Sequence, residues 1–542
     1  MPNTLDCLIV GAGFSGIALA TELKKRNCTF LIADQNPSVG GTWFTNRYPG
    51  ARCDTPTVDY AFHHSPLFDQ TWQWSEDFAT QPEILEYLQQ FTNFEQLQPF
   101  LLLNTKLSDL TWDEKRKQWQ ATFTDGKTLT ARFIALALGS LSKPFTPTLP
   151  GHEQYEGQQW HTAQWPDTCP SFRDKSIAVV GTGASGIQII PELAKECKKL
   201  YVIQRTPSLA MPASDNQQAF INRRRIRKTQ RKLFLNMLEN SQFGSSSPTA
   251  KTPGTNMSDE ELETRFDICW RNADLFAMIG ITTDLFSNIQ SNRRVENLFH
   301  QRLRSHSLSK SLADTLLNTP DPFGTKRICI ERGYYASLSK SNVQLIDVRD
   351  SDVSLERHSI HCSKSNRNEK LLPTDHQPER STGYQIDAVI YATGFEAFTG
   401  AILDVDIQGC SGVQLRDFWG SFPKTIAGIF VRGFPNLFLL QGPGSPSVLT
   451  NMAQSAQVQA RLISQTICNQ LDVHDSVIEV TSNQEIQWMS HSQMLLEKTL
   501  FYNTRSWYSQ KSNVNPQLHF LPYVGGIPKY EKEYQSIIAP QI

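Results

Sequence analysis

The sequence predicts an α/β protein built around two parallel sheets, because one pattern occurs in it twice. A short apolar strand at residues 7–10 runs directly into the loop GAGFSG at residues 11–16. A second strand at residues 177–180 runs into GTGASG at residues 181–186 in the same way. A strand, a tight glycine loop and a helix in this order form the βαβ unit that binds dinucleotides. We therefore expect two Rossmann-like dinucleotide-binding domains in one chain.

The size and composition of the chain limit what it can be. With 542 residues it is too long for one hydrophobic core, so roughly two to four domains are expected. A content of 39% apolar and 19% charged residues is typical of a folded soluble protein. The net charge of −1 provides no general attraction to nucleic acid or to acidic membranes. The 10 cysteines include no CxxC pair, which argues against a zinc ribbon or a dithiol redox centre.

The sequence shows no targeting segment. The first strand begins within a few residues of Met1, which leaves no room for the apolar core of a signal peptide. No apolar run approaches the ~20 residues that a membrane helix needs, and the last residues are no peroxisomal address. We expect a soluble, cytoplasmic, monomeric protein with reduced cysteines, no membrane span and no nucleic-acid partner.

The first glycine loop has every part of a nucleotide-binding unit. Gly11 permits the tight turn, Gly13 lets the main chain approach a pyrophosphate, and Gly16 allows close packing of helix on strand. The N-terminus of the following helix offers N–H groups and a positive dipole end to phosphates. The second strand, at residues 30–33, ends at Asp34, whose carboxylate would accept hydrogen bonds from ribose hydroxyls.

The second unit differs at the place that selects the coenzyme. Its strand at residues 200–203 is followed by Gln204, Arg205 and Thr206 and by no acidic residue. An arginine here suits the 2′-phosphate of NADP through charge-assisted hydrogen bonds, although a solvated surface arginine is the alternative. We expect FAD in the first unit and NADPH in the second. The loop residues expected to contact the second nucleotide are Gly181, Thr182, Gly183, Ser185 and Gly186.

The two units are expected to be interleaved along the chain. Residues 211–322 are rich in Gln, Asn, Ser and charges, with helical stretches, and predict a helical insertion. Its basic run at residues 223–228 is interpreted as a solvated helix face, with a nuclear-import or anion-binding patch as the alternative. The expected segments are the FAD-binding domain at 1–150 and 387–542, the NADP-binding domain at 151–210 and 323–386, and the insertion between its two parts.

A signature stands between the units, in YEGQQWHTAQWP at residues 155–166. Its Gly157, His161 and Trp165 closely match the bridging motif of the Baeyer–Villiger monooxygenases, the FAD- and NADPH-dependent class B flavoprotein monooxygenases. The resemblance extends over nearly the whole chain, from the first glycine loop to residues 524–528. A histidine in an interdomain signature is more often an organiser than a base, so we expect His161 to donate to the main chain across a joint.

The resemblance also implies roles for four other segments. The GGTW…YPGxxxD motif at residues 40–54 implies a loop that wraps FAD, with Asp54 beside the flavin. The GTKR…YY segment at residues 323–335 implies that Arg327 enters the active site and that Lys326 holds the NADP phosphate. Residues 442–452 match a substrate-pocket segment. The remaining residues implied are Gly41, Thr42, Trp43 and Tyr60 for FAD, Val448, Leu449 and Met452 for the pocket, and Trp507 in a segment that covers NADP and substrate.

The implied reaction explains why an arginine is needed. Reduced flavin and dioxygen give a flavin C(4a)-peroxide that must stay anionic to add to a ketone carbonyl, and the adduct is also negative. A guanidinium keeps its proton at working pH and suits both species, and Asp54 would orient it. We expect oxygen insertion next to a ketone carbonyl to give an ester or lactone, without a metal. The alternatives are a flavin monooxygenase that oxidises N or S in soft nucleophiles, whose bridging motif usually ends in Tyr/Phe-Lys, and a flavin-binding regulatory protein without turnover.

Overall fold

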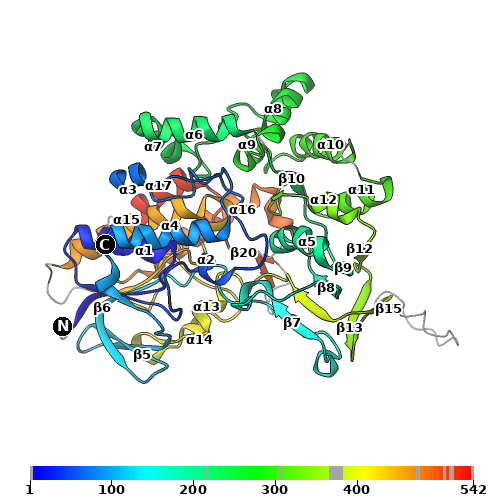
Figure 1. Cartoon of the computed structure of the whole chain (residues 1–542). Coiled ribbons are helices and arrows are strands. Elements are labelled where there is room, and N and C mark those ends of the chain that lie inside the picture. The colour runs from blue at the N-terminus through cyan, green and yellow to red at the C-terminus, as the bar shows by residue number, and fades with distance from the viewer. Residues whose placement is uncertain are drawn as a thin grey trace, which may run out of the picture.

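The computed structural model describes residues 4–214, 216–305, 308–364, 382–471, 473, 477–504, 508–511 and 518–538. Trp507 and most of the polar stretch at residues 363–382 lie outside these ranges. The predicted α/β class with two Rossmann-like sheets is confirmed. The first sheet, at the left of Figure 1, and the second, at its right, lie side by side under a row of helices.

The first sheet has eight strands in the order β17-β4-β5-β6-β1-β2-β3, with β18 also paired to β6. Its centre is parallel: β1 (Leu5–Val10) pairs with β2 (Phe30–Ala33) on one side and β6 (Thr128–Leu136) on the other. Every residue of β2 is buried, as expected for a parallel strand covered on both faces. Strands β4 and β5 pair antiparallel at one side of the sheet. The remaining strands are β3 (Leu101–Leu102), β4 (Leu107–Asp113), β5 (Gln118–Phe123), β17 (Asp406–Gln408) and β18 (Leu437–Leu439).

Two helices, α1 (Phe14–Lys25) and α15 (Met452–Leu471), pack on each other against one face of this sheet. Apolar residues of α1, such as Ile17 and Leu23, are fully buried there. The sequence predicted α1, which follows the first glycine loop, but it did not predict α15. The C-terminal helices α16 (Ser482–Glu497) and α17 (Ile527–Ile537) join the same core.

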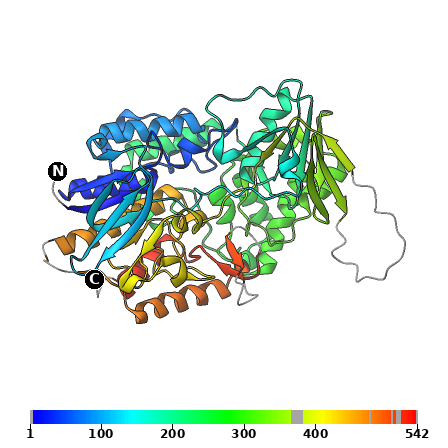
Figure 2. The same ribbon diagram turned by 90° about the horizontal axis from the view of Figure 1, so that it is seen from below.

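The second sheet has five parallel strands in the order β12-β9-β8-β16-β7. They are β7 (Gln158–His161), β8 (Ser176–Val180), β9 (Lys199–Gln204), β12 (Val343–Asp347) and β16 (Ala388–Tyr391). Strand β16 pairs with both β7 and β8, so residues 388–391 belong to the second sheet and not to the FAD-binding part expected at 387–542. The chain returns to the first sheet after β16. A small antiparallel sheet, β13 (Ser351–Glu356), β14 (Ser359–Lys364) and β15 (Thr382–Gln385), lies at the end of the molecule farthest from the first sheet (Figure 2).

The expected helical insertion is present and runs along the top of Figure 1. It contains α6 (Gln217–Thr229), α7 (Arg231–Asn240), α8 (Asp259–Arg271), α9 (Leu275–Ile279), α10 (Ile289–Ser305) and α11 (Lys310–Leu317). Between α7 and the short η4 (Gly254–Asn256), the described residues 241–253 form no helix or strand. Among the residues that the structure describes, none of the helices is both long and apolar enough to cross a membrane.

The basic run in α6 is a solvated helix face only in part. Arg225 and Lys228 are exposed, whereas the side chains of Arg223 and Arg227 are only 12% and 8% exposed. Arg223 bonds to Asp77 at 2.5 Å and to Asp274 at 2.7 Å, and Arg227 pairs with Asp69. The buried part of the run therefore anchors the insertion to α3 and the loop that follows it. Its partners are far away in the sequence, so the run alone could not show this.

The remaining elements connect these layers. The loop predicted at residues 40–54 contains a short helix, α2 (Thr42–Thr45), where only loop was expected. Others are α3 (Pro66–Thr71), α4 (Gln81–Phe94), β10 (Ala210–Pro212), β11 (Cys329–Glu331), α5 (Ala184–Glu196), α12 (Tyr334–Leu338), α13 (Gly400–Leu403), α14 (Leu415–Trp419), β19 (Ser509–Lys511), β20 (Leu518–Phe520) and the 3-10 turns η1 (Gln98–Phe100), η2 (His152–Gln154), η3 (Thr162–Gln164), η5 (Cys410–Gly412), η6 (Ser447–Leu449) and η7 (Leu500–Asn503).

Candidate active site

An arginine and an aspartate from opposite halves of the molecule meet between the two sheets. Arg327 Nε donates to Asp54 Oδ2 at 3.0 Å and Arg327 Nη2 donates to Asp54 Oδ1 at 2.6 Å. Arg327 Nη1 donates to the Val448 carbonyl at 3.3 Å. Burial alone would lower the pKa of the Arg327 guanidinium, but the charge and hydrogen bonds of Asp54 raise it well above its ordinary value. Asp54 therefore holds the permanently charged guanidinium of Arg327 in a fixed orientation.

The guanidinium faces a cavity of about 240 Å³, which we call the inner cavity. Val448 and Leu449, both predicted for the substrate pocket, line it. Met452 is not among its lining residues, because its side chain turns into the packing behind η6, where the Ser447 hydroxyl lies 3.4 Å from its sulfur. The insertion and the C-terminal part also line this cavity, which the sequence did not predict. Their lining residues include Leu275, Ile279, Phe286, Phe501, Tyr508 and Tyr523.

The first glycine loop fits a dinucleotide. Gly11 has a φ of 110°, and a methyl group there would lie 2.3 Å from the Ala137 carbonyl oxygen. Gly13 faces Gly41, where a methyl group would lie 2.9 Å from Gly13 Cα, so the two predicted FAD motifs touch through glycines. Asp34 Oδ2 accepts from the Ala12 N–H at 2.6 Å, which places this carboxylate at the loop. Among the described residues no side chain caps α1 at Gly13, so its first N–H groups remain available to a phosphate.

Aromatic packing holds the loop of residues 40–54 against this unit. Trp43 Nε1 donates to Tyr60 Oη at 3.2 Å, and the Tyr60 ring meets Phe14, at the start of α1, edge to face. Thr42 starts α2 immediately after Gly41. The predicted FAD-side residues therefore lie together around the N-terminus of α1.

The same loop also reaches the second unit, which the sequence did not predict. Tyr48 Oη donates to Gln188 Oε1 of α5 at 2.8 Å. A methyl group on Gly50 would lie 2.4 Å from the Gln188 carbonyl oxygen, so glycine is needed for this approach. The loop that carries Asp54 is thus attached to both nucleotide units.

The second glycine loop repeats the first. A methyl group on Gly181 would lie 2.4 Å from the Ala392 carbonyl, and one on Gly186 would lie 2.3 Å from the Gly181 carbonyl. Gly183 begins α5, whose N-terminus no described side chain caps. Thr182 Oγ1 lies 3.3 Å from the Thr206 carbonyl, and Ser185 lies in the first turn of α5, so both sit at this loop.

The two basic residues predicted to contact NADP lie on separate segments. Arg205 directly follows β9, at the carboxyl end of the sheet, and is exposed. Lys326 pairs with Asp321 at 2.7 Å, next to Arg327. Their roles toward NADP stay predictions.

The signature residues form a joint. The Ala163 N–H donates to His161 Nδ1 at 3.0 Å, so the proton of the neutral ring lies on Nε2, which is near the main chain of Gly394 and Phe145 but has no hydrogen-bond partner among the described residues. Burial lowers the pKa of His161. The Trp165 carbonyl accepts from Arg47 Nε at 3.1 Å. A methyl group on Gly157 would lie 2.7 Å from the Asp387 carbonyl. These contacts are those of an organiser.

In the part of the chain that the structure describes, no group of three or more His, Cys, Asp or Glu side chains is arranged to hold a metal ion. The candidate site consists of the partly buried ion pair, the inner cavity and the N-termini of α1 and α5, which no described side chain caps.

Known proteins share this arrangement over the full length. A family model for pyridine nucleotide-disulphide oxidoreductases matches residues 8–291. The acetone monooxygenase (methyl acetate-forming) of Gordonia sp. (strain TY-5) is 30% identical, with 97% of this chain and 96% of that protein aligned. A Baeyer–Villiger monooxygenase of Pseudooceanicola batsensis is 27% identical over 98% and 94% of the two chains. The phenazine N-monooxygenase PhzNO1 of Lysobacter antibioticus is also 27% identical, over 98% and 95%.

A solved structure agrees with these relatives. The crystal structure of OTEMO in complex with FAD and NADP has a TM-score of 0.89 and 28% identity, covering 100% of this chain and 98% of that one. FAD and NADP are thus bound in a homologous structure of the same fold. Taken with the glycine loops, the joint at His161 and the match along the whole chain, this places the protein in the Baeyer–Villiger monooxygenase family of class B flavin monooxygenases.

Proposed function

We propose that this protein uses FAD, NADPH and dioxygen to insert one oxygen atom next to a ketone carbonyl, giving an ester or a lactone. The observation that carries the proposal is the Arg327–Asp54 pair at the wall of the inner cavity. The relatives support it, because one of them is named for forming methyl acetate from acetone.

The residues present fit both cofactors. Gly11, Gly13 and Asp34, with the loop of residues 40–54, would hold FAD. The loop from Gly181 to Gly186 and Arg205 would hold NADPH. When it is bound and reduced by NADPH, FAD supplies the chemistry that activates dioxygen.

Arg327 then has a defined task. Negative charge develops on the substrate oxygen when a nucleophile adds to a ketone carbonyl, and a preorganised cation stabilises that charge without reorganising. Asp54 orients the guanidinium through two hydrogen bonds, and the Val448 carbonyl holds its remaining edge. The apolar wall of Val448, Leu449 and Phe501 excludes water and presents the carbonyl carbon.

N- or S-oxidation of a soft nucleophile is the second candidate. It is favoured by the similarity to a phenazine N-monooxygenase. Oxidation of a neutral amine or thioether develops no oxyanion on the substrate, so a fixed guanidinium would have less negative charge to stabilise. The Arg327–Asp54 ion pair therefore favours a ketone as the substrate over an amine or a thioether.

A substrate panel with one variant tests the proposal. Purified protein with NADPH should oxygenate some of a set of linear, cyclic and polycyclic ketones in preference to an amine and a thioether, as measured by product analysis and oxygen uptake. Arg327→Ala should still have its flavin reduced by NADPH, but should lose about 100- to 1000-fold in ester formation, the usual cost of removing one preorganised donor.

Arg327→Lys is the matched control. It keeps the charge but cannot span both oxygens of Asp54, so its rate of ester formation should fall between those of the unmodified protein and Arg327→Ala. Normal ester formation by Arg327→Ala would contradict the proposal.

A further inference from the structure

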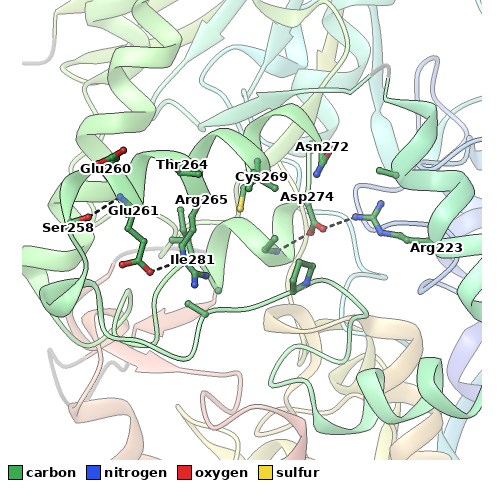
Figure 3. Close-up of a pocket in the computed structure, with 16 residues that line it drawn as sticks. Arg223, Ser258, Glu260, Glu261, Thr264, Arg265, Cys269, Asn272, Asp274 and Ile281 are labelled. Carbon is green, nitrogen blue, oxygen red and sulfur yellow. Dashed lines mark hydrogen bonds and ion pairs between the residues drawn. The ribbon is translucent and has the colours of Figure 1, made fainter.

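A second, larger cavity opens inside the helical insertion (Figure 3). This outer pocket has a volume of about 740 Å³ and is walled by α6, α8, α9 and the segment of residues 248–250. Its apolar lining includes Ala219, Pro248, Ile268 and Ile281.

The wall between the outer pocket and the inner cavity is one residue thick. Ala250 and Gly280 line both spaces. The Ala250 N–H donates to the Gly280 carbonyl at 2.8 Å, and this bond closes the wall. A methyl group on Gly280 would lie 2.5 Å from Thr249 Cγ2, so a larger residue at 280 would push the wall inward. Thr249 itself faces the inner cavity.

One side of the outer pocket is held rigidly and its charges are already paired. Asp274 Oδ1 accepts from the Ala277 N–H at 3.0 Å and so caps α9, while Asp274 Oδ2 accepts from Arg223 Nη2 at 2.7 Å (Figure 3). Arg223 also bonds to Asp77. Arg265 lies 3.6 Å from Glu261 in an ion pair. These charges compensate one another, and the remaining lining carboxylate, Glu260, is exposed to solvent, so the inner part of the lining favours an apolar group.

The other side has no regular secondary structure. Residues 248–250 lie in the stretch of the described chain at 241–253 that forms no helix or strand. Across the pocket, Ile268 of α8 is 45% exposed and lines its mouth. An apolar chain that enters past α8 would therefore meet the wall formed by Ala250 and Gly280, and Arg327 lines the cavity on the other side of that wall.

The volumes of the inner cavity and the outer pocket indicate the size of the substrate that the site accepts. The inner cavity is smaller than the roughly 300–1,000 Å³ typical of sites for drug-sized ligands, whereas the outer pocket falls inside that range. We propose that the outer pocket is the distal part of the substrate site and holds the neutral, apolar body or tail of an elongated ketone whose carbonyl lies at Arg327. This inference rests on the proposed function and narrows its substrate class.

A series of linear methyl ketones of increasing chain length tests the inference. In the unmodified holoenzyme, kcat/KM should rise with chain length. Thr264→Trp and Ile268→Trp fill the outer pocket from exposed positions of α8, so the KM for the longest ketones should rise about tenfold or more, as expected when a hydrophobic subsite is lost. The KM for the shortest ketones and the rate of flavin reduction by NADPH should stay unchanged.

Glu263→Trp is the matched control, because Glu263 is an exposed residue of α8 that does not line the pocket. Ala250→Leu enlarges the wall and should likewise reduce kcat/KM for long ketones more than for short ones. An equal effect on short and long ketones, or no effect of either tryptophan on long ones, would overturn the inference. Oxidation of short ketones with no gain for long ones would also overturn it and leave the proposed function standing. A protein that oxidises no ketone would overturn the proposed function itself.

Discussion

Asp54 and Arg327 lie 273 positions apart, yet both oxygens of one carboxylate accept hydrogen bonds from one guanidinium. The resemblance predicted each residue, and its motifs are local, so a single sequence was enough to find them. Their contact depends on the tertiary fold, so neither local motif could predict it. Met452 shows the same limit, because its position in a pocket motif did not reveal that its side chain turns away from the cavity.

Arg205 is the residue at which coenzyme choice can be tested. The flavin should bleach faster with NADPH than with NADH, and Arg205→Ala should lose about 10- to 100-fold of that preference, since hydrogen bonds to charged groups contribute about 1.5–3 kcal/mol. Anaerobic flavin reduction by each coenzyme is the measurement. Arg304→Ala, in the exposed part of α10, is the control. Equal rates with both coenzymes in the unmodified protein would contradict the role given to Arg205.

His63 makes stability depend on pH. It is buried, its Nε2 lies 3.1 Å from the Asp59 carbonyl, and burial and then the charge of Arg227 lower its pKa well below the ordinary value. As the pH falls below about 6.5, the unfolded chain therefore gains a proton that the folded chain cannot bind. The stability that His63 contributes is present above that pH and is lost below it.

The expected result is a melting temperature that falls on acidification, and falls less steeply in His63→Gln, which keeps a donor to the Asp59 carbonyl. Thermal unfolding of both proteins across the range from about pH 7.5 to about pH 5.5 is the measurement. Identical slopes for the two proteins would show that His63 is not the group responsible.

Among the elements, α6 differs most from what its sequence suggested. Strands β1 and β8 were predictable because each is a short apolar run that leads into a glycine loop, and β2 and β9 because each is the next apolar run after the helix that follows the loop. Helix α6 was taken for a surface helix because five of its residues are basic and their partners were unknown. The short helix α2 was missed for a related reason, since its Gly- and aromatic-rich sequence is typical of a loop.

Asp69 tests the anchoring of α6 and α7. It pairs with Arg227 and with Arg231 and is itself only 9% exposed. Asp69→Ala leaves two guanidinium groups without their carboxylate in a buried place, so we expect it to lower the free energy of unfolding by about 3–5 kcal/mol.

Denaturant unfolding is the measurement, with Asp314→Ala as the control. Asp314 pairs with Arg304 on the surface, both about half exposed, and its loss should change stability by no more than about 0.5–1 kcal/mol. Equal losses in the two variants would contradict the anchoring role of Asp69.

At the scale of the whole molecule, the joint at His161 connects the two sheets. The residue ends β7, in the second sheet, and its ring faces the main chain at Phe145 and Gly394, where the chain crosses between the sheets. The signature made the joint predictable, but the second bridge, from Tyr48 and Gly50 to Gln188, was not, because nothing in those residues alone indicates a partner.

His161→Ala should leave the fold intact and lower kcat and KM together, as changes at hinges often do, with turnover falling by about fivefold to tenfold if one hydrogen bond of about 1 kcal/mol is lost. Steady-state oxygenation and flavin reduction should be measured side by side, with Trp160→Phe, a nearby change outside the three signature residues, as the control. Unchanged turnover in His161→Ala would refute the coupling role.

The bridge built by residues 40–54 has a consequence for assembly. Asp54 comes from the FAD side, Arg327 comes from the segment between the insertion and β11, and Gln188 of α5 holds the loop that presents Asp54. The oriented guanidinium therefore depends on residues from both halves and is present only when the two halves are in contact. A molecule whose halves have separated would therefore lose the Asp54–Arg327 pair while each nucleotide unit kept its own glycine loop.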